Sequence, residues 1–205
     1  MFTGIVETMG QIVDVRNNGL NKTFVIRTEI CAKLKVDQSI SHNGVCLTVE
    51  KLSQEDQTYE VSAILETLGK TTLDGWRKGD FVNLERSITI DQRLDGHLVQ
   101  GHVDGILTCL EALDQNGSTY FTFALPEHER HLVIPQGSIT LDGMSLTVAG
   151  LDDTSLAVAI IPFTFEHTVA KYWQAGSNVN VEYDVFGKYL ARYRELFAGS
   201  FQPIN

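Results

Sequence analysis

The chain has 205 residues, 43% of them hydrophobic, and a formal net charge of −10. This composition is typical of a globular protein with one or two hydrophobic cores. An acidic chain without a basic run argues against nucleic-acid binding through phosphate neutralisation, and no apolar run reaches the length of a membrane span. The first residues lack the basic segment that begins a signal peptide.

The cysteines and histidines give no pattern of a disulfide framework or a metal centre. Cys31, Cys46 and Cys109 are odd in number and include no C-x-x-C pair. We therefore expect reduced thiols and a cytoplasmic location. His128 and His131 form a lone H-x-x-H pair, which is weak support for a metal, so no metal is predicted.

In the first half of the chain, short alternating segments separated by turn residues predict strands. They cover residues 2–7, 11–15, 22–28, 59–64 and 81–85. Short helices are expected at residues 31–34 and 66–73, the second with Thr67 as a candidate cap. Asn43-Gly44 supplies the positive φ angles that a two-residue hairpin loop needs.

The second half of the chain repeats the first. The hairpin at residues 39–49 returns at residues 138–148 with six of eleven positions identical, and Gly4 aligns with Gly101. Seven further positions recur at a constant offset of 97: Thr67, Thr71, Trp76, Gly79, Val82, Asn83 and Glu85. A period of this length is that of a small domain and not of a solenoid repeat.

We therefore predict a mainly β protein made of two tandem, pseudo-symmetric Greek-key β-barrels. The expected domains are residues 1–96 and 97–186, followed by a C-terminal helix and tail at residues 187–205. In that helix Tyr189, Leu190, Tyr193, Leu196 and Phe197 form one apolar stripe. The stripe predicts either packing on its own chain or self-association.

Two modules of one fold could bind two ligand molecules, and the positions at which the repeats diverge are candidates for chemistry. Ile5 aligns with His102, Cys46 with Ser145, and Ser87 with Asp184. Histidine is the side chain best suited to proton transfer near neutral pH, and a cysteine thiolate is a nucleophile. These residues alone are also compatible with structural roles, in which Cys46 is a buried thiol and His102 is a hydrogen-bonded structural histidine.

Four stretches resemble one family across nearly the whole chain: residues 1–7, 43–49, 96–104 and 142–148. They are similar to riboflavin synthase of the alpha-chain type, built from lumazine-binding repeats. The resemblance implies two six-stranded barrels and dismutation of two 6,7-dimethyl-8-ribityllumazine molecules to riboflavin and 5-amino-6-ribitylaminouracil, without a cofactor. It also implies a homotrimer formed through the C-terminal helix, with the active site between the N-barrel of one subunit and the C-barrel of its neighbour. An association with lumazine synthase is left open.

The resemblance also implies roles for individual residues. His102 and Thr147 would act near deprotonation of a lumazine methyl group. Cys46, Ser145 or a water would add to the second ring, and Asp184 would support proton transfer. The implied first pocket consists of Gly4, Ile5, Val6, Thr48, Ser62, Ile64 and Thr67. The implied second pocket consists of Gly101, His102, Val103, Ser145, Thr147, Ile161, Pro162 and Thr164. The wider substrate-binding set adds Phe2, Thr3, Cys46, Leu47, Ala63, Leu65, Glu66, Gln136, Leu146, Phe163, Phe165 and Glu166.

One position departs from the family pattern. Many members carry Lys where this chain has Gln136, which places a contact to the ribityl chain or the ring oxygens in question.

Two other functions compete with catalysis: a non-catalytic lumazine- or flavin-binding protein, and a duplicated barrel that serves only as an interaction module. The presence of all five catalytic candidates favours the enzyme.

Overall fold

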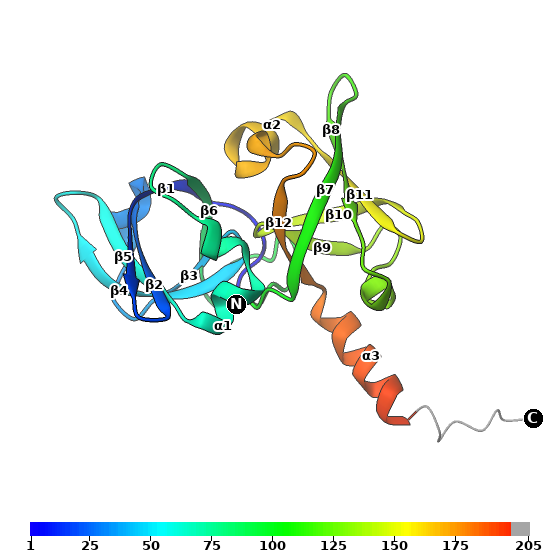
Figure 1. The fold of residues 1–205 in the computed structure, drawn as a ribbon, viewed down its shortest axis with the longest axis horizontal. Helices are drawn as coiled ribbons and strands as arrows, with labels where there is room; N and C mark the ends of the chain where they lie inside the picture. The colour runs from blue at the N-terminus through cyan, green and yellow to red at the C-terminus, as the bar shows by residue number, and fades with distance from the viewer. Residues whose placement is uncertain (198–205) are drawn as a thin grey trace, which may run out of the picture.

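The computed structural model describes residues 1–197 as two closed β-barrels followed by a helix (Figure 1). The first barrel consists of β1 (Thr8–Asn18), β2 (Asn21–Arg27), β3 (Ser39–His42), β4 (Val45–Ser53), β5 (Thr58–Ala63) and β6 (Phe81–Arg86). The second consists of β7 (Gly105–Asp114), β8 (Thr119–Ala124), β9 (Ser138–Leu141), β10 (Met144–Leu151), β11 (Ser155–Ile160) and β12 (Asn178–Tyr183). The helices are α1 (Leu65–Lys70), α2 (Pro162–His167) and α3 (Val185–Phe197), with 3₁₀ helices η1 (Glu29–Lys33), η2 (Thr72–Gly75), η3 (Glu127–Leu132) and η4 (Val169–Tyr172).

Both barrels have the same antiparallel topology. Around the first, the strand order is β1-β2-β5-β4-β3-β6, and the second follows the equivalent order β7-β8-β11-β10-β9-β12. Register shifts in β1 and β4 recur in β7 and β10. Bulges of this kind bend a strand and increase its twist, which helps a six-stranded sheet to close. The predicted pair of six-stranded Greek-key barrels is confirmed.

Each barrel has its own core around one tryptophan. Trp76 meets Phe24 edge to face at 5.3 Å, and Trp173 meets Phe121 and Phe123 at 5.2 and 5.4 Å. Buried side chains alternate along the strands, as the period-2 pattern predicts. The recurrence of the two tryptophans therefore reflects a shared core.

Two local predictions for the first repeat are wrong. Residues 2–7 do not run as a strand of the first barrel, because Phe2 forms only an isolated bridge with Val99. Thr67 does not cap α1, whose N-cap is Ile64. The side-chain cap is made by Thr71, at the N-terminus of η2. Its hydroxyl accepts Leu73 N–H at 3.3 Å and donates to the Thr67 carbonyl at 2.7 Å, which joins η2 to α1. Thr168 repeats these contacts in the second barrel.

The two barrels meet at their hairpin turns. Asn43-Gly44 and Asp142-Gly143 all have positive φ angles, as a type I′ turn requires. The turns lie so close that a Cβ on Gly143 would come within 2.7 Å of the Gly44 nitrogen. The sequence predicts the turn type, whereas the contact between the turns depends on the packing of the barrels.

Two amide side chains cross this boundary and lock the barrels together. Asn83 Nδ2 donates to the Asp142 carbonyl and Asn180 Nδ2 donates to the Asn43 carbonyl, both at 2.9 Å. Asn83 Oδ1 and Asn180 Oδ1 each accept a backbone N–H from the 3₁₀ region of the opposite barrel, at 2.8 Å. All four bonds link the two repeats, which accounts for the recurrence of Asn83 as Asn180.

Asp142 breaks the symmetry of this boundary because its counterpart is the neutral Asn43. The Asp142 carboxylate accepts Asn180 N–H at 2.9 Å and Trp173 Nε1–H at 3.0 Å. Burial nevertheless raises the pKa of Asp142 from 3.8 to about 7. A group with a raised folded-state pKa binds its proton more tightly in the folded protein. The free energy of unfolding therefore falls as pH rises from about 4 to about 7.

Replacing Asp142 with Asn should remove this pH dependence. Relative to the variant, the wild type should lose about 2–4 kcal/mol of unfolding free energy between pH 4 and pH 8, from the size of the pKa shift. Urea denaturation at several pH values would measure the difference, in which other carboxylates cancel. Asn43→Asp, at the symmetric position, should steepen the slope. Identical slopes in wild type and Asp142→Asn would contradict a titrating buried carboxylate.

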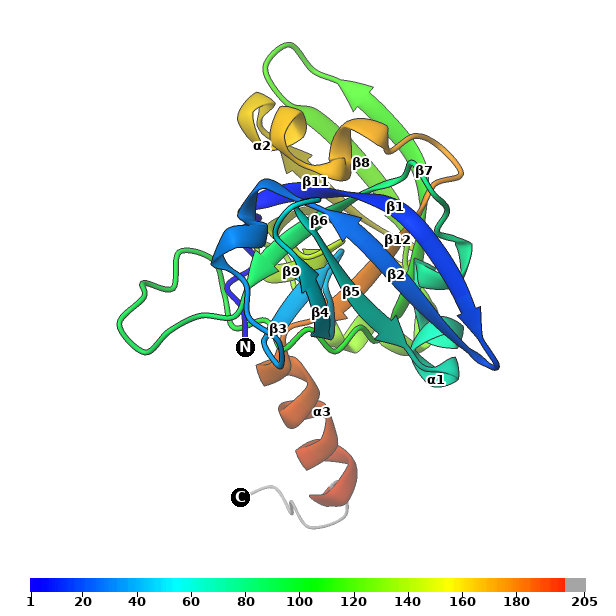
Figure 2. The ribbon, with the colours of Figure 1, turned by 90° about the vertical axis from the view of Figure 1, so that its left-hand side faces the viewer.

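Helix α3 begins at Val185, not at Gly187 as expected, because the Asp184 carboxylate accepts Phe186 N–H at 2.9 Å and so caps the helix. The helix projects away from both barrels (Figures 1 and 2). Its apolar stripe is exposed in the single chain: Tyr189 is 73% and Leu190 69% accessible. The tail beyond residue 197, part of the predicted C-terminal segment, lies outside the described residues. Within residues 1–197, no helix has the length and apolar character needed to span a membrane.

Candidate active site

A short arm precedes each barrel, and each arm lies against the other repeat. We call residues 2–6 the first arm and residues 99–103 the second arm. The Gly4 carbonyl accepts Ser145 N–H at 2.7 Å, and the Gly101 carbonyl accepts Cys46 N–H at 2.9 Å. Val6 packs on the core of the second barrel and Val103 on the core of the first. Each potential ligand surface therefore combines one barrel with the arm of the other repeat.

The glycines in the arms are required by this close approach. Gly4 and Gly101 have φ angles of +77° and +79°, which L side chains rarely adopt. A Cβ on Gly4 would lie 2.6 Å from Ser145 Cβ, and one on Gly101 would lie 2.6 Å from Cys46 Cβ. The two glycines allow the arms to touch the hairpin strands that carry the candidate nucleophiles.

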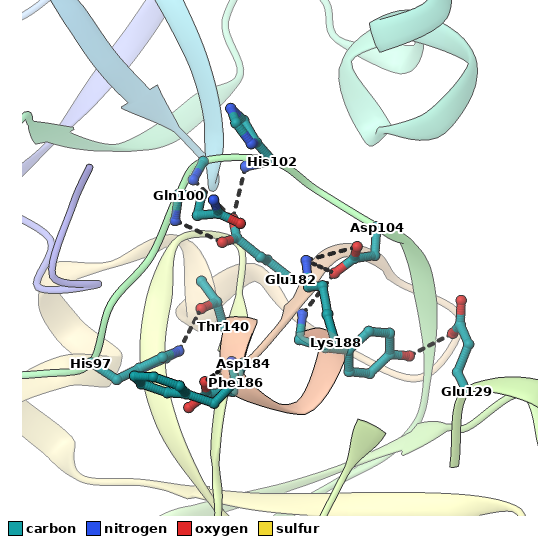
Figure 3. A network of polar contacts seen from close by, with 12 residues as sticks. His97, Gln100, His102, Asp104, Glu129, Thr140, Glu182, Asp184, Phe186 and Lys188 are labelled. Atoms are coloured by element: carbon teal, nitrogen blue, oxygen red, sulfur yellow. Dashed lines mark hydrogen bonds and ion pairs between the residues drawn. The ribbon is translucent and has the colours of Figure 1, made fainter. Parts of the chain in front are cut away.

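A buried carboxylate anchors each arm. Glu85 on β6 accepts Thr3 N–H at 2.6 Å, the Thr3 hydroxyl at 2.7 Å and Gly4 N–H at 2.9 Å. Glu182 on β12 accepts the N–H groups of Gln100, Gly101 and His102 at 2.7, 2.9 and 2.8 Å (Figure 3). Burial raises the pKa of both carboxyls, and the donated N–H groups oppose that shift. These anchors explain the recurrence of Glu85 as Glu182.

The exchange of arms gives a grouping of residues that differs from the implied pockets. Gly4, Ile5 and Val6 belong with the second barrel, and Gly101, His102 and Val103 belong with the first. The pockets that the family resemblance implies group each arm with its own repeat, whereas in the structure each arm packs against the opposite barrel. We call the first barrel with the second arm the first half-site, and the second barrel with the first arm the second half-site.

The three polar residues that distinguish the second repeat do not gather at one place. His102 is exposed on the second arm, next to the Gly101–Cys46 contact. Ser145 and Asp184 belong to the second barrel. The structure thus places His102 with the half-site that contains Cys46 and separates it from Ser145 and Asp184.

His97, which the sequence analysis did not single out, lies next to Ser145. His97 Nδ1 lies 2.7 Å from Ser145 Oγ, and its Nε2 lies 3.1 Å from Thr140 Oγ1 (Figure 3 shows the Thr140 contact). Burial lowers the pKa of His97, and the charge of Asp184 partly opposes this. In the tautomer protonated at Nε2, Nδ1 can accept the Ser145 hydroxyl proton. Comparison of the repeats could not reveal His97, because its counterpart position would precede Met1.

The remaining predicted residues lie on the strands and junctions around each half-site. Cys46 is half-buried and Thr48 exposed on β4 while Leu47 is buried between them, as the strand alternation predicts. On β10, Ser145 is likewise half-buried and Thr147 exposed, and Leu146 between them is partly buried against the core of the second barrel. Large apolar side chains are exposed where β5 and β11 lead into α1 and α2: Ile64, Leu65, Ile161 and Phe163. Exposed apolar groups of this kind mark binding surfaces.

Gln136 lies beside β10, because its backbone N–H donates to the Val148 carbonyl at 3.0 Å. It precedes β9 in a turn, with a φ of +62° and an exposed side chain. A contact of Gln136 with the ribityl chain or the ring oxygens across a subunit boundary stays a prediction.

Both half-sites are open surfaces in the single chain. His102, Thr48 and Thr147 are all exposed. The chain also forms a cavity of about 770 Å³, but this lies between the barrels and is lined by Trp76, Trp173 and their neighbours. An arrangement with two open, matched surfaces can hold two similar planar molecules if another surface covers each one.

The chain matches the family model described as the lumazine binding domain twice, at residues 3–87 and 100–184. It is 40% identical over 195 residues to riboflavin synthase of Bacillus amyloliquefaciens, covering 94% of this chain and 89% of that protein. Riboflavin synthase of Saccharomyces cerevisiae is 32% identical over 207 residues, covering 94% of this chain and 85% of the yeast protein. These relatives extend over nearly the whole chain.

Solved structures share the same fold. LumP complexed with riboflavin superimposes with a TM-score of 0.83 at 21% identity, covering 89% of this chain and 99% of that chain. LumP complexed with 6,7-dimethyl-8-(1'-D-ribityl) lumazine gives a TM-score of 0.80 at 22% identity, covering 89% and 98%. With its two lumazine binding domains and near full-length likeness to the bacterial and yeast enzymes, the chain belongs to the riboflavin synthase family.

Proposed function

We propose that the chain is a riboflavin synthase that dismutates two molecules of 6,7-dimethyl-8-ribityllumazine. One lumazine donates a four-carbon unit to the other, and the products are riboflavin and 5-amino-6-ribitylaminouracil. The observation that carries this proposal is the pair of matched half-sites, each made from one barrel and the arm of the other repeat. Two identical substrates need two such surfaces, and the near full-length riboflavin synthase relatives support this choice of substrate.

Much of the rate enhancement would come from holding the two rings in contact. Well-oriented reactants gain several kcal/mol from proximity alone. A methyl group on an electron-poor lumazine is acidic enough for a modest base, and the exposed His102 would take such a proton in the first half-site. Thr147 would assist on the facing surface. His102 is held by its backbone N–H on Glu182, which leaves the imidazole free for substrate.

The second half-site would carry the acceptor chemistry. We propose that Ser145, or a water that it orients, adds to the second ring, with His97 accepting the proton and Asp184 supporting the imidazole. The short Ser145–His97 contact supports this division of roles. Cys46 is the corresponding candidate in the first half-site.

We propose that these half-sites are completed by assembly into a homotrimer through α3. The exposed stripe on α3 and the open half-sites support this assembly, because exposed apolar surface of this extent marks an interaction site. The first barrel of one subunit would then cover the second barrel of the next. Three free cysteines fit a reducing, cytoplasmic location. Association with lumazine synthase stays a prediction.

A turnover assay separates this function from the alternative of a lumazine- or flavin-binding protein without activity. Purified protein mixed with 6,7-dimethyl-8-ribityllumazine alone should produce riboflavin absorbance, with two lumazines consumed per riboflavin. A binding protein would give a fluorescence change at stoichiometric ligand without product. Saturable binding with no riboflavin would contradict the proposed activity.

A further inference from the structure

An ion pair connects the second arm to α3. Asp104 follows that arm directly, and its Oδ2 accepts Tyr183 N–H at 2.9 Å. Lys188, in the first turns of α3, places its Nζ 2.6 Å from Asp104 Oδ2 and 2.8 Å from Oδ1 (Figure 3). Both side chains are about one quarter exposed, at 25% and 27%. The segment that carries His102 is therefore tied at its end to the C-terminal helix.

In the first repeat, the equivalent carboxylate is paired by a residue of the barrel and not by a helix. Glu7, the counterpart of Asp104, accepts Arg86 N–H at 2.8 Å and forms an ion pair with the Arg86 guanidinium at 2.8 Å. Arg86 belongs to β6, so the first arm is fastened by its own barrel. The second repeat has Tyr183 at the arginine position, and its hydroxyl donates to Glu129 at 2.5 Å instead. The cation that the strand lacks is supplied by Lys188.

The place of Lys188 in the helix is unfavourable unless it has such a partner. The N-terminal end of a helix carries partial positive charge, which disfavours a cation there. Asp184, the acidic N-cap of α3, lies four residues before Lys188, but its carboxylate accepts Phe186 N–H, and the first turn itself contains no acidic residue. Lys188 instead pairs with Asp104 from outside the helix, which indicates that Lys188 serves the contact with the arm.

The charge of Lys188 also acts on the carboxylate that anchors the arm. Burial raises the pKa of Glu182, and the three arm N–H groups and Lys188 oppose that shift. The other titratable groups around Glu182 are Asp104 and His102 on the arm side, and His97, which binds Thr140 opposite Glu182 on β9. Lys188 is the cation among them that favours the ionised form, in which Glu182 accepts all three arm N–H groups.

We propose that Lys188 is a positioning residue for His102, joining the assembly helix to the second arm through Asp104 and Glu182. This inference rests on the proposed role of His102 in turnover. Besides carrying the apolar stripe, α3 then has a second role, because it holds the arm in the geometry that presents His102. A part of the catalytic geometry is thereby built only when α3 is in place.

The test compares three variants of the full chain. Lys188→Met removes the charge and keeps much of the aliphatic stem, whereas Lys188→Arg retains the cation. Lys22→Met is the matched control, because Lys22 pairs with Asp74 at 2.6 Å and is 23% exposed, and this ion pair joins β2 to η2 within the first barrel. In Lys188→Met we expect faster amide hydrogen exchange in the peptide spanning residues 98–104, with the peptide of the first arm unchanged. Sedimentation should stay that of the wild type.

Turnover provides the second measurement. A small displacement of a catalytic group costs rate more than binding, so kcat of Lys188→Met should fall about tenfold with KM within about twofold. The acid limb of the kcat profile should move to higher pH, because Glu182 loses the cation that favours its ionised form. Lys188→Arg should restore both the rate and the profile, and Lys22→Met should match the wild type.

Several results would overturn the inference. Lys188→Met with wild-type exchange in residues 98–104 would show that the ion pair does not hold the arm. A loosened arm with unchanged kcat and pH profile would show that it does not position His102. If Lys22→Met changed amide exchange and kcat as much as Lys188→Met, the ion pair of Lys188 would contribute only to general stability. Absence of turnover in the wild type would instead contradict the proposed function, and the exchange measurement would still decide whether Lys188 holds the arm.

Discussion

Replacing His102 with Gln is expected to lower kcat by about 10²–10⁴, the usual contribution of a general acid–base group. Glutamine keeps the backbone N–H bond to Glu182 and occupies similar space, but its amide does not take up a proton near neutral pH. The fold and the ligand affinity should therefore be retained. Steady-state kinetics and binding measured by fluorescence would separate the two effects.

His128→Gln is the matched control for this experiment. His128 is highly exposed in the region of η3 and has only a neighbouring carboxylate, Glu129, at 3.7 Å. Its replacement should leave kcat within about twofold of the wild type. If His102→Gln turned over within about threefold of the wild type, His102 would have no part in proton transfer.

Ending the chain after Asp184 is expected to convert the protein to monomers and to lower turnover to below about 1% of the wild type. The two barrels have separate cores and a hydrogen-bonded boundary, so they should remain folded and bind ligand. Without α3 the half-sites of neighbouring chains would no longer face each other, and the gain from proximity would be lost. Analytical ultracentrifugation and the riboflavin assay would measure both consequences.

A second variant separates loss of assembly from loss of the contact between Lys188 and Asp104. Tyr189→Asp combined with Tyr193→Asp puts two charges into the exposed stripe and leaves Lys188 in place. This variant should also be monomeric and inactive, whereas Lys188→Met should keep the assembly. A truncated monomer with full turnover would show that the active site lies within one chain, and the site between subunits would have to be abandoned.

The local features of the fold could be predicted because their causes are local. Asn43-Gly44 and Asp142-Gly143 adopt the positive φ angles that their residue types favour, and the alternating pattern around Leu47 sets which side chains are buried. The same reasoning wrongly predicts a strand at residues 2–7, because their sequence pattern is that of a strand. Phe2 pairs instead with Val99 of the second arm, nearly one hundred residues away, and no short-range pattern identifies such a partner.

The candidate residues of the site were predictable from the repeats, but their grouping was not. Divergence between aligned positions singled out His102, Ser145 and Asp184. The structure separates His102 from the other two, because Gly101 docks on Cys46 of the opposite barrel. His97 escaped the comparison because it has no counterpart in the first repeat.

The sequence by itself determined the duplication, the turn types and the residues available for chemistry, since each of these depends on side chains close together along the chain or on the match of one repeat to the other. Only the tertiary structure decided which residues share a half-site. Arm exchange, the amide contacts of Asn83 and Asn180, and the pairing of Lys188 with Asp104 all join segments far apart in the chain. Their geometry depends on how two closed barrels pack, because closure uses every strand edge and leaves the arms, turns and helix to make the remaining contacts.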